Sequence, residues 1–203
     1  MATTTPNYGW TVPTSTDLVK DGATAIETLG DAIDASMNTA LGTKKAGMVL
    51  LNTTSFSGVS SQSVNDVFSA TYDTYRLVTS FFGSTSADSR IKWRISGADN
   101  SSNAYYTQNL LASTSSVSTN LNGPVTTGHI LGTHVTTNPM VSTYDIGTPF
   151  ATTKTQIIGM HAKDSEFELK NGVYDAGASF TGFTIIPASG TITGSVSVYG
   201  YNK

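Results

Sequence analysis

Residues 90–95 read RIKWRI, a segment in which apolar Ile91, Trp93 and Ile95 alternate with basic side chains. Alternation with a period of two turns the apolar side chains to one face of an extended strand and the charged ones to the other. The same period recurs in EFELK, residues 166–170, and in ITGSVSVY, residues 192–199. These segments predict β-strands with one face toward a core and the other toward solvent.

Further apolar runs extend this pattern over most of the chain. We expect strands at 48–51, 75–82, 104–111, 129–135, 140–144, 157–162 and 180–186, with turns at 97–100, 122–124, 171–172 and 189–190. Residues 113–127 are dense in Ser, Thr, Asn and Gly and are expected to form a long loop. The fold class predicted for residues 46–203 is therefore mainly β, an antiparallel β-sandwich of the jelly-roll kind with about eight to eleven strands.

The composition limits the partners of the chain. Of 203 residues 12% are charged and the net charge is −3, so no positive field is available to attract a phosphate backbone or an anionic membrane surface. Cysteine is absent, which excludes disulfides and Cys-based metal sites. No apolar run reaches the length of a membrane span. We therefore expect no nucleic-acid partner and no membrane insertion.

Residues 1–16, MATTTPNYGWTVPTST, are punctuated by proline and glycine and predict an extended arm. Tyr8, Trp10, Val12 and Pro13 give this arm its apolar character. Aromatic side chains on a Pro-bracketed segment are good interface anchors, so these four residues are the candidate attachment site. The alternative is that Tyr8 and Trp10 fold back on their own domain.

Residues 17–42 carry the helical signal of the chain. Apolar residues follow a heptad pattern at Val19, Ile26, Leu29, Ile33 and Met37. Thr16 or Asp17 is expected to cap the helix, Gly22 to mark a break and Gly42 to end it. The pattern predicts a short coiled coil that joins copies of the chain; a single helix packed on its own domain is the alternative.

Residues able to carry chemistry are few. The chain has no nucleophile-elbow, zinc-protease or nucleotide-binding motif. His129, His134 and His161 are candidate metal ligands, but 129 and 134 differ by an odd number and should face opposite sides of a strand. We expect no metal, no cofactor and no catalysis.

Carboxylates and aromatic rings offer two weaker candidates. Asp164, Glu166 and Glu168 share a parity, so one strand face would present three carboxylates, either as a cation or glycosidase site or as the charged face of an edge strand. Six aromatic residues could stack on a sugar, although strand aromatics more often form core and interfaces. They are Trp93, Tyr105, Tyr106, Tyr144, Tyr199 and Tyr201.

The segment PNYGWTVPTSTDLVKDGATAIETLGDAID, residues 6–34, resembles the N-terminal module of tail-fibre-like and minor tail proteins of tailed phages. GTITGSVSVYGYNK, residues 190–203, is similar to the endings of many such proteins, and SGADNSS (96–102) and PFATTKT (149–155) resemble them more weakly. The resemblance implies a virion component made in the bacterial cytoplasm, a homo-oligomer and most simply a trimer. Its first residues would bind another tail, neck or capsid protein, and its β domain would face outward toward a host surface glycan or a virion neighbour.

Three functions follow from this resemblance. A short tail-fibre-like protein is the first, and a capsid head fibre or decoration protein that stabilises the shell is the second, because the chain has no repetitive shaft. A virion-associated polysaccharide-degrading enzyme is the third.

Overall fold

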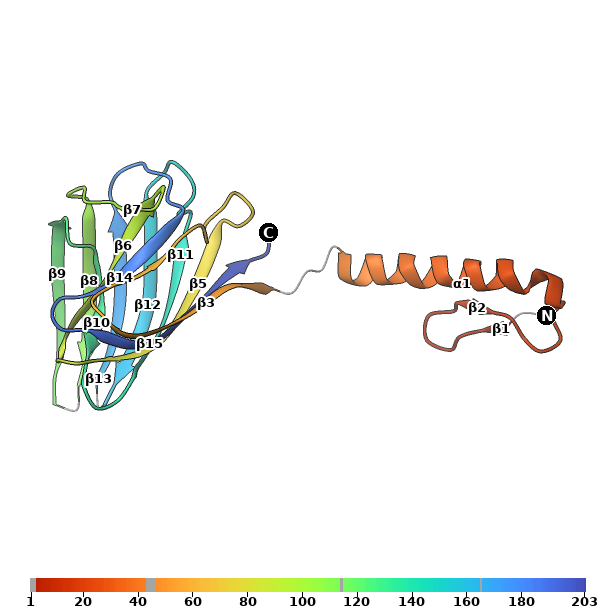
Figure 1. The fold of residues 1–203 in the computed structure, drawn as a ribbon, viewed down its shortest axis with the longest axis horizontal. Helices are drawn as coiled ribbons and strands as arrows, with labels where there is room; N and C mark the ends of the chain where they lie inside the picture. Colours follow the sequence, from red (N-terminus) through yellow and green to blue (C-terminus); the bar gives the residue numbers. More distant parts are fainter. Residues whose placement is uncertain (1–2, 43–46, 114, 165) are drawn as a thin grey trace. The chain divides into compact units, whose positions relative to one another are not determined.

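The computed structural model describes residues 3–42, 47–113, 115–164 and 166–203. The chain divides into two compact units, residues 1–47 and residues 48–203. The first unit holds the helix, and the second is built from antiparallel sheets (Figure 1). The prediction of a mainly β chain with large antiparallel sheets and one short helix is confirmed.

The N-terminal unit is a small hairpin beside a helix. Strand β1 (Thr3–Thr4) pairs antiparallel with β2 (Thr11–Val12), and the backbone amide of Thr5 donates to the carbonyl of Trp10 at 2.9 Å. Residues 1–16 were predicted as an extended arm, whereas residues 3–12 form this hairpin. Gly9, with φ of +68°, supplies the left-handed residue that the loop before Trp10 requires.

The helical segment has three parts, and their bounds test the break, end and cap that the sequence predicted. A 3-10 turn, η1 (Val19–Asp21), leads into α1 (Gly22–Met37), which continues into a π-helical turn, η2 (Asn38–Gly42). The predicted break at Gly22 is thus the change from 3-10 to α-helix, and the described part of the helical segment extends to Gly42, so the predicted end there borders residues that the structure does not describe. The predicted side-chain cap is wrong, because the Asp17 carboxylate accepts from the backbone amide of Thr14 at 2.7 Å instead.

The β unit contains thirteen strands among the residues described. They are β3 (Met48–Val59), β4 (Gln62–Val64), β5 (Thr74–Gly83), β6 (Ala87–Ile95), β7 (Ala98–Asp99), β8 (Tyr105–Ala112), β9 (Val117–Val125), β10 (His129–His134), β11 (Met140–Gly147), β12 (Thr155–Lys163), β13 (Glu166–Tyr174), β14 (Gly182–Pro187) and β15 (Ile192–Tyr201). Each predicted strand is present, while β4, β7 and β9 had not been predicted. Strand β9 replaces most of the predicted long loop because its Ser, Thr and Asn residues pair with β8.

Two antiparallel sheets make up the β unit (Figure 1). The larger sheet has the order β3-β15-β5-β11-β12-β13-β8-β9, and the smaller has the order β10-β6-β14-β4 with β7 on β6. Strand β15 lies between β3 and β5, two strands that are remote from it in sequence. The sheets share one core, whose largest fully buried side chains include Trp93, Tyr75, Phe81 and Phe183.

Candidate functional site

The four candidate attachment residues lie on the hairpin and just after it. Tyr8 is 71% exposed and stacks on Trp10, with ring centroids 5.0 Å apart. The Trp10 indole N–H donates to the Ser36 hydroxyl at 2.9 Å, so this aromatic pair is held against α1. Val12 is half-buried and Pro13 is exposed. The hairpin therefore presents Tyr8 and Pro13 to solvent while Trp10 fixes it to the helix.

The five candidate oligomerisation residues form an apolar stripe along the helical segment. Val19 is 95% exposed, Ile26 66% and Met37 52%, whereas Leu29 and Ile33 are half-buried. No side chain of residues 3–40 is buried. Burial of apolar side chains is the main source of stability, so this unit exposes the groups that would normally stabilise it.

A second candidate surface lies on the larger sheet, on the face turned away from the core. Eight large apolar side chains there are 39–70% exposed, and we call them the outer apolar face. They are Leu110 of β8, Val117 and Leu121 of β9, Val141 of β11, Ile158 and Met160 of β12, and Phe167 and Leu169 of β13.

Strand register gathers these residues into adjoining rows. Met160, Leu169 and Leu110 are direct neighbours across β12, β13 and β8. Phe167 lies in the next row, between Ala162 and Ala112. The outward positions of β12, β13, β8 and β9 hold no Asp, Glu, Lys or Arg among the residues described. The outer apolar face is therefore uncharged, and Asn171 and Gln108 are the polar side chains between Ile158 and Leu121 in its third row.

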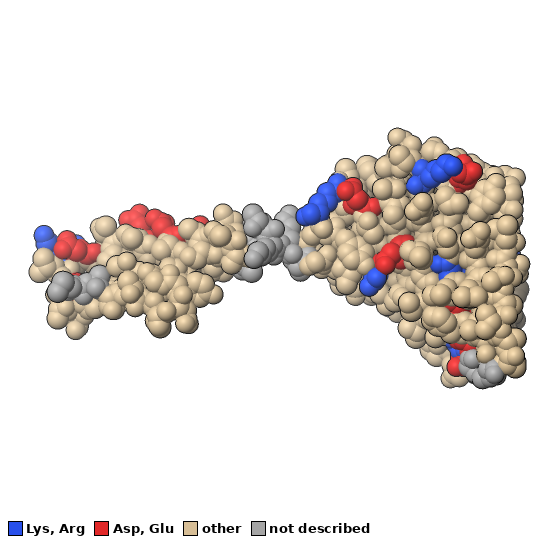
Figure 2. All heavy atoms as spheres, turned by 180° about the vertical axis from the view of Figure 1, so that it is seen from behind, with Lys and Arg blue, Asp and Glu red and all other residues tan. Residues whose placement is uncertain are grey.

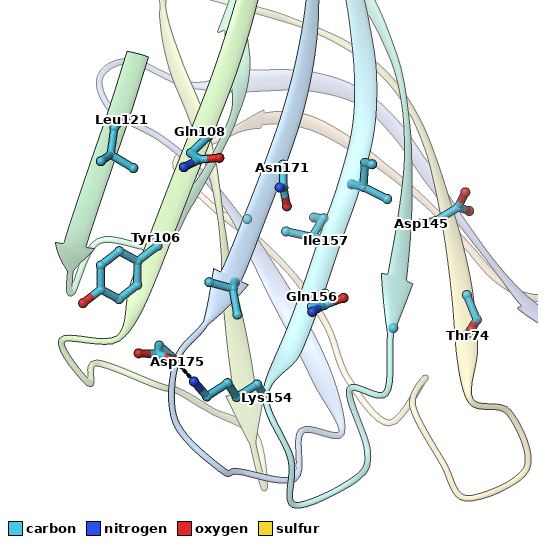
Figure 3. Close-up of a pocket in the computed structure, with 14 residues that line it drawn as sticks. Thr74, Tyr106, Gln108, Leu121, Asp145, Lys154, Gln156, Ile157, Asn171 and Asp175 are labelled. Carbon is cyan, nitrogen blue, oxygen red and sulfur yellow. Dashed lines mark ion pairs between the residues drawn. The ribbon is translucent and has the colours of Figure 1, made fainter. Parts of the chain in front are cut away.

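The outer face is hollowed in two adjoining places. Leu110, Leu121, Ile158 and Leu169 line a hollow of about 710 Å³ within the outer apolar face. A second hollow, of about 940 Å³, is more polar, and Figure 3 shows Tyr106, Gln108, Asn171 and Gln156 along its strands. The Lys154–Asp175 ion pair lies at one end of it (Figure 3).

Asp145 borders the polar hollow and is neutralised by its neighbours. The Arg76 guanidinium donates to both carboxylate oxygens, at 2.8 and 2.7 Å, and holds the pKa of Asp145 below its ordinary value. The Tyr201 hydroxyl donates to the same carboxylate at 2.9 Å. This fixed trio leaves no free charge at that edge of the hollow.

The charged residues of β13 point inward, which corrects the predicted orientation of this strand. Glu168 and Lys170 have side chains that are 7% exposed, and the Lys170 ammonium lies 2.5 Å from the Glu168 carboxylate. His161 Nδ1 lies 3.2 Å from the same carboxylate. Burial raises the pKa of Glu168, but His161 and Lys170 outweigh it and hold this pKa at about 2. A buried pair of this kind is tolerated because each charge has its partner.

The acidic row predicted at Asp164, Glu166 and Glu168 is not assembled. Asp164 lies outside the strands, with φ of +43°, and accepts from the Asn138 side chain. Glu166 pairs with Lys163 at 2.8 Å, and Glu168 is buried. Strand β13 is also not an edge strand, since it pairs with β12 and β8. Both predictions for this row, a cation or glycosidase site and the charged face of an edge strand, are therefore wrong.

The three histidines are all buried between the sheets. His129 and His134 were expected on opposite sides of β10, and this is wrong because a bulge between Ile130 and Gly132 shifts the parity. His129 Nδ1 donates to the Tyr106 carbonyl at 3.1 Å, and burial lowers the pKa of His129 to about 4. Gly132 lies over the third histidine: a Cβ there would be 2.5 Å from His161 Nδ1.

The candidate stacking aromatics divide between core and surface. Trp93, Tyr105 and Tyr144 are fully buried, and the Tyr144 hydroxyl donates to the Leu131 carbonyl. Tyr106, Tyr199 and Tyr201 are half-exposed, and Tyr106 lines the polar hollow.

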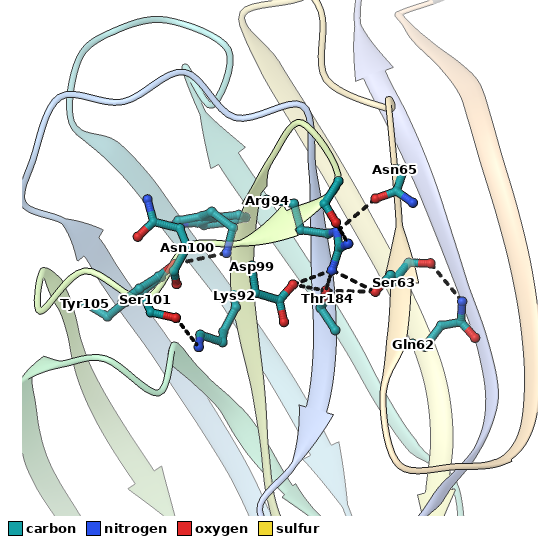
Figure 4. Close-up of polar contacts among 12 residues, drawn as sticks. Gln62, Ser63, Asn65, Lys92, Arg94, Asp99, Asn100, Ser101, Tyr105 and Thr184 are labelled. Carbon is teal, nitrogen blue, oxygen red and sulfur yellow. Dashed lines mark hydrogen bonds and ion pairs between the residues drawn. The ribbon is translucent and has the colours of Figure 1, made fainter.

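Arg94 anchors a polar cluster on the smaller sheet that the sequence analysis did not identify. Its guanidinium pairs with Asp99 and donates to Ser63, Asn65 and Thr184 (Figure 4). Each of the three guanidinium nitrogens donates to an acceptor within the chain, so this cluster ties β4, β6, β7 and β14 together. On the face of the β unit drawn in Figure 2, the sparse charged groups likewise lie mostly beside groups of opposite sign.

Among the described residues, no cluster of three or more His, Asp or Glu is placed to hold a metal ion. No helix in the described part of the chain is long and apolar enough to cross a membrane. Comparison of the chain with protein-family models, with curated proteins and with solved structures gives no match.

Proposed function

We propose that this chain is a non-enzymatic structural component of a tailed-phage virion, a short tail-fibre-like protein attached through its N-terminal unit. The observation that carries the proposal is that residues 3–40 have no buried side chain while Val19, Ile26 and Met37 are exposed. Such a unit gains its stability from contact with other chains. The resemblance of residues 6–34 to phage tail modules supports a virion as the place of that contact.

In this proposal the two apolar parts of the N-terminal unit have separate roles. The stripe on α1 joins copies of the chain, as a trimer, and Tyr8 with Pro13 binds another virion protein. The β unit, a jelly-roll-like domain in this proposal, then projects outward to a host surface glycan or a neighbouring virion protein. A head fibre or capsid decoration protein is the second candidate, favoured by the lack of a repetitive shaft.

Self-association through the helix is tested by equilibrium sedimentation of the purified chain. The wild type is expected to sediment as an oligomer, and Ile26→Asp, which places a charge in the stripe, is expected to weaken association by at least about ten-fold. Asp31→Asn, on an exposed position of the same helix, is the matched control. A wild-type monomer of 21.3 kDa at micromolar concentration would contradict the proposal.

Attachment is tested in particles that assemble with the chain. Tyr8→Ala is expected to lower the number of copies per particle while the circular dichroism of the purified chain stays unchanged, because Tyr8 is mostly exposed. Asn7→Ala is the control. Full occupancy with Tyr8→Ala would place the attachment elsewhere.

A further inference from the structure

Strand β13, at the centre of the outer apolar face, reverses the usual arrangement of a β-sandwich strand. Along β13, Phe167 and Leu169 point to solvent, while Glu168 and Lys170 point to the core. An antiparallel sheet with one face in water normally has the opposite order. Serine and threonine are abundant in this chain, so its composition does not force apolar side chains onto the outer face. The reversal requires a second burial partner for this face.

We infer that the outer apolar face is a contact surface between copies of this chain. This inference rests on the self-association proposed above and assigns it a second surface, on the β unit. Three observations favour a second copy as the occupant: the absence of charge, the shape of the face and its size.

The absence of charge and the shape favour a copy of the same face. An uncharged face does not select a partner by opposite charge. The face also contains a large side chain, Phe167, and in the neighbouring rows a hollow between Leu121, Ile158 and Leu169. In a self-complementary contact, the Phe167 ring of one copy would enter the hollow of the other. Symmetric assemblies require such complementarity within one chain.

The size of the face fits a contact that is shared with the helix. Five strands about 4.8 Å apart, with three rows of side chains, give a footprint of about 400–500 Å². An exposed apolar patch of that size is as large as the largest patch on a typical monomer, and such patches are often functional. A stable interface buries about 800 Å² per partner, so a second contact is needed. Association through α1 supplies it and raises the local concentration of the β units.

The test uses the absence of cysteine in the chain. Leu169→Cys introduces a single thiol in the outer apolar face, and Ser55→Cys introduces one at an exposed position of β3 on the same side of the same sheet. Alkylation by a maleimide is followed in purified protein at a concentration where the chain is oligomeric and again after dilution to monomer. Leu169→Cys is expected to react at least about ten-fold more slowly in the oligomer, and Ser55→Cys at the same rate in both.

The outcomes separate this inference from the function on which it rests. An oligomer in which both thiols react equally fast would overturn the contact through the sheet and leave association through the helix in place. Protection of Leu169→Cys only in intact particles would also overturn it, because the occupant would then be another virion protein. A chain that is monomeric at every concentration would remove both proposals. As a second variant, Leu169→Lys is expected to weaken association at least about ten-fold and Ser55→Lys less than about two-fold.

Discussion

The N-terminal unit and the β unit use their apolar residues in opposite ways. In residues 3–40 no side chain is buried, and Ile26 is 66% exposed, whereas Trp93, Phe183 and Leu77 of the β unit are 0% exposed. One chain thus combines a unit with its own buried core and a unit whose described apolar side chains are all at least partly exposed. The difference shows that heptad or period-two spacing predicts a helix or a strand. The spacing does not show whether the apolar side chains of that element are buried within the same chain.

The largest effect is expected from removing a core side chain of the β unit. Trp93→Ala should lower the free energy of unfolding by about 3–5 kcal/mol, because it leaves a cavity among fully buried aromatic rings. Urea unfolding followed by far-ultraviolet circular dichroism measures this loss. A change below about 1 kcal/mol would show that the core relaxes around the missing ring.

Breaking the buried ion pair of β13 tests whether this unit tolerates charge inside only when it is paired. Lys170→Met should cost about 3 kcal/mol, since the Glu168 carboxylate then loses its ammonium partner inside the sandwich. The double variant Lys170→Met with Glu168→Leu should recover most of that loss. Equal losses in the single and double variants would mean that the pair acts through its packing and not through its charge.

Acid should destabilise the β unit through its buried histidines. Burial lowers the pKa of His129 to about 4 from an ordinary 6.5, so the unfolded chain binds more protons between these values and stability falls as pH drops through them. From pH 7 to pH 5 the loss should be about 2 kcal/mol, and buried His134, with a lowered pKa, adds to it. Glu168 does not contribute at pH 5, because its stabilisation is lost only between its ordinary pKa of 4.5 and about 2.

This pH dependence is best measured in a Trp10→Phe background, in which the fluorescence of Trp93 reports the β unit alone. His129→Gln removes the titrating group and should remove most of the slope between pH 7 and pH 5. A slope that persists in this variant would assign the acid sensitivity to other groups.

The smallest effect is expected in the N-terminal unit. Leu29→Ala removes a half-buried side chain of α1 and should change the free energy of unfolding of the β unit, measured with urea, by less than about 0.5 kcal/mol. Ser36→Ala, which removes the acceptor of the Trp10 indole, serves for comparison within the same unit. A large shift of the β midpoint would show that the two units unfold together.

Local pattern was enough to predict ten of the thirteen described strands of the β unit but not the direction in which β13 faces. The alternation around Phe167 and Leu169 gave the parity correctly, yet parity alone does not show which side meets the core. His129 and His134 share a side because one extra residue in β10 changes the parity, and a bulge has no signal in a pattern of two. Strand β9 was not predicted because Ser, Thr and Asn separate its apolar residues Val117 and Leu121, and its order comes from pairing with β8.

The position of β15 between β3 and β5 sets the order of events during synthesis. Residues 48–59 and 74–83 emerge from the ribosome long before residues 192–201, which must insert between them. Until then both strands have an unpaired edge, and unpaired edges invite the wrong partners. Pairings so distant in sequence also form slowly. A nascent chain interrupted before residue 192 therefore lacks the strand that joins β3 to the rest of the sheet, so interrupted translation should yield an aggregation-prone fragment rather than a shorter working protein.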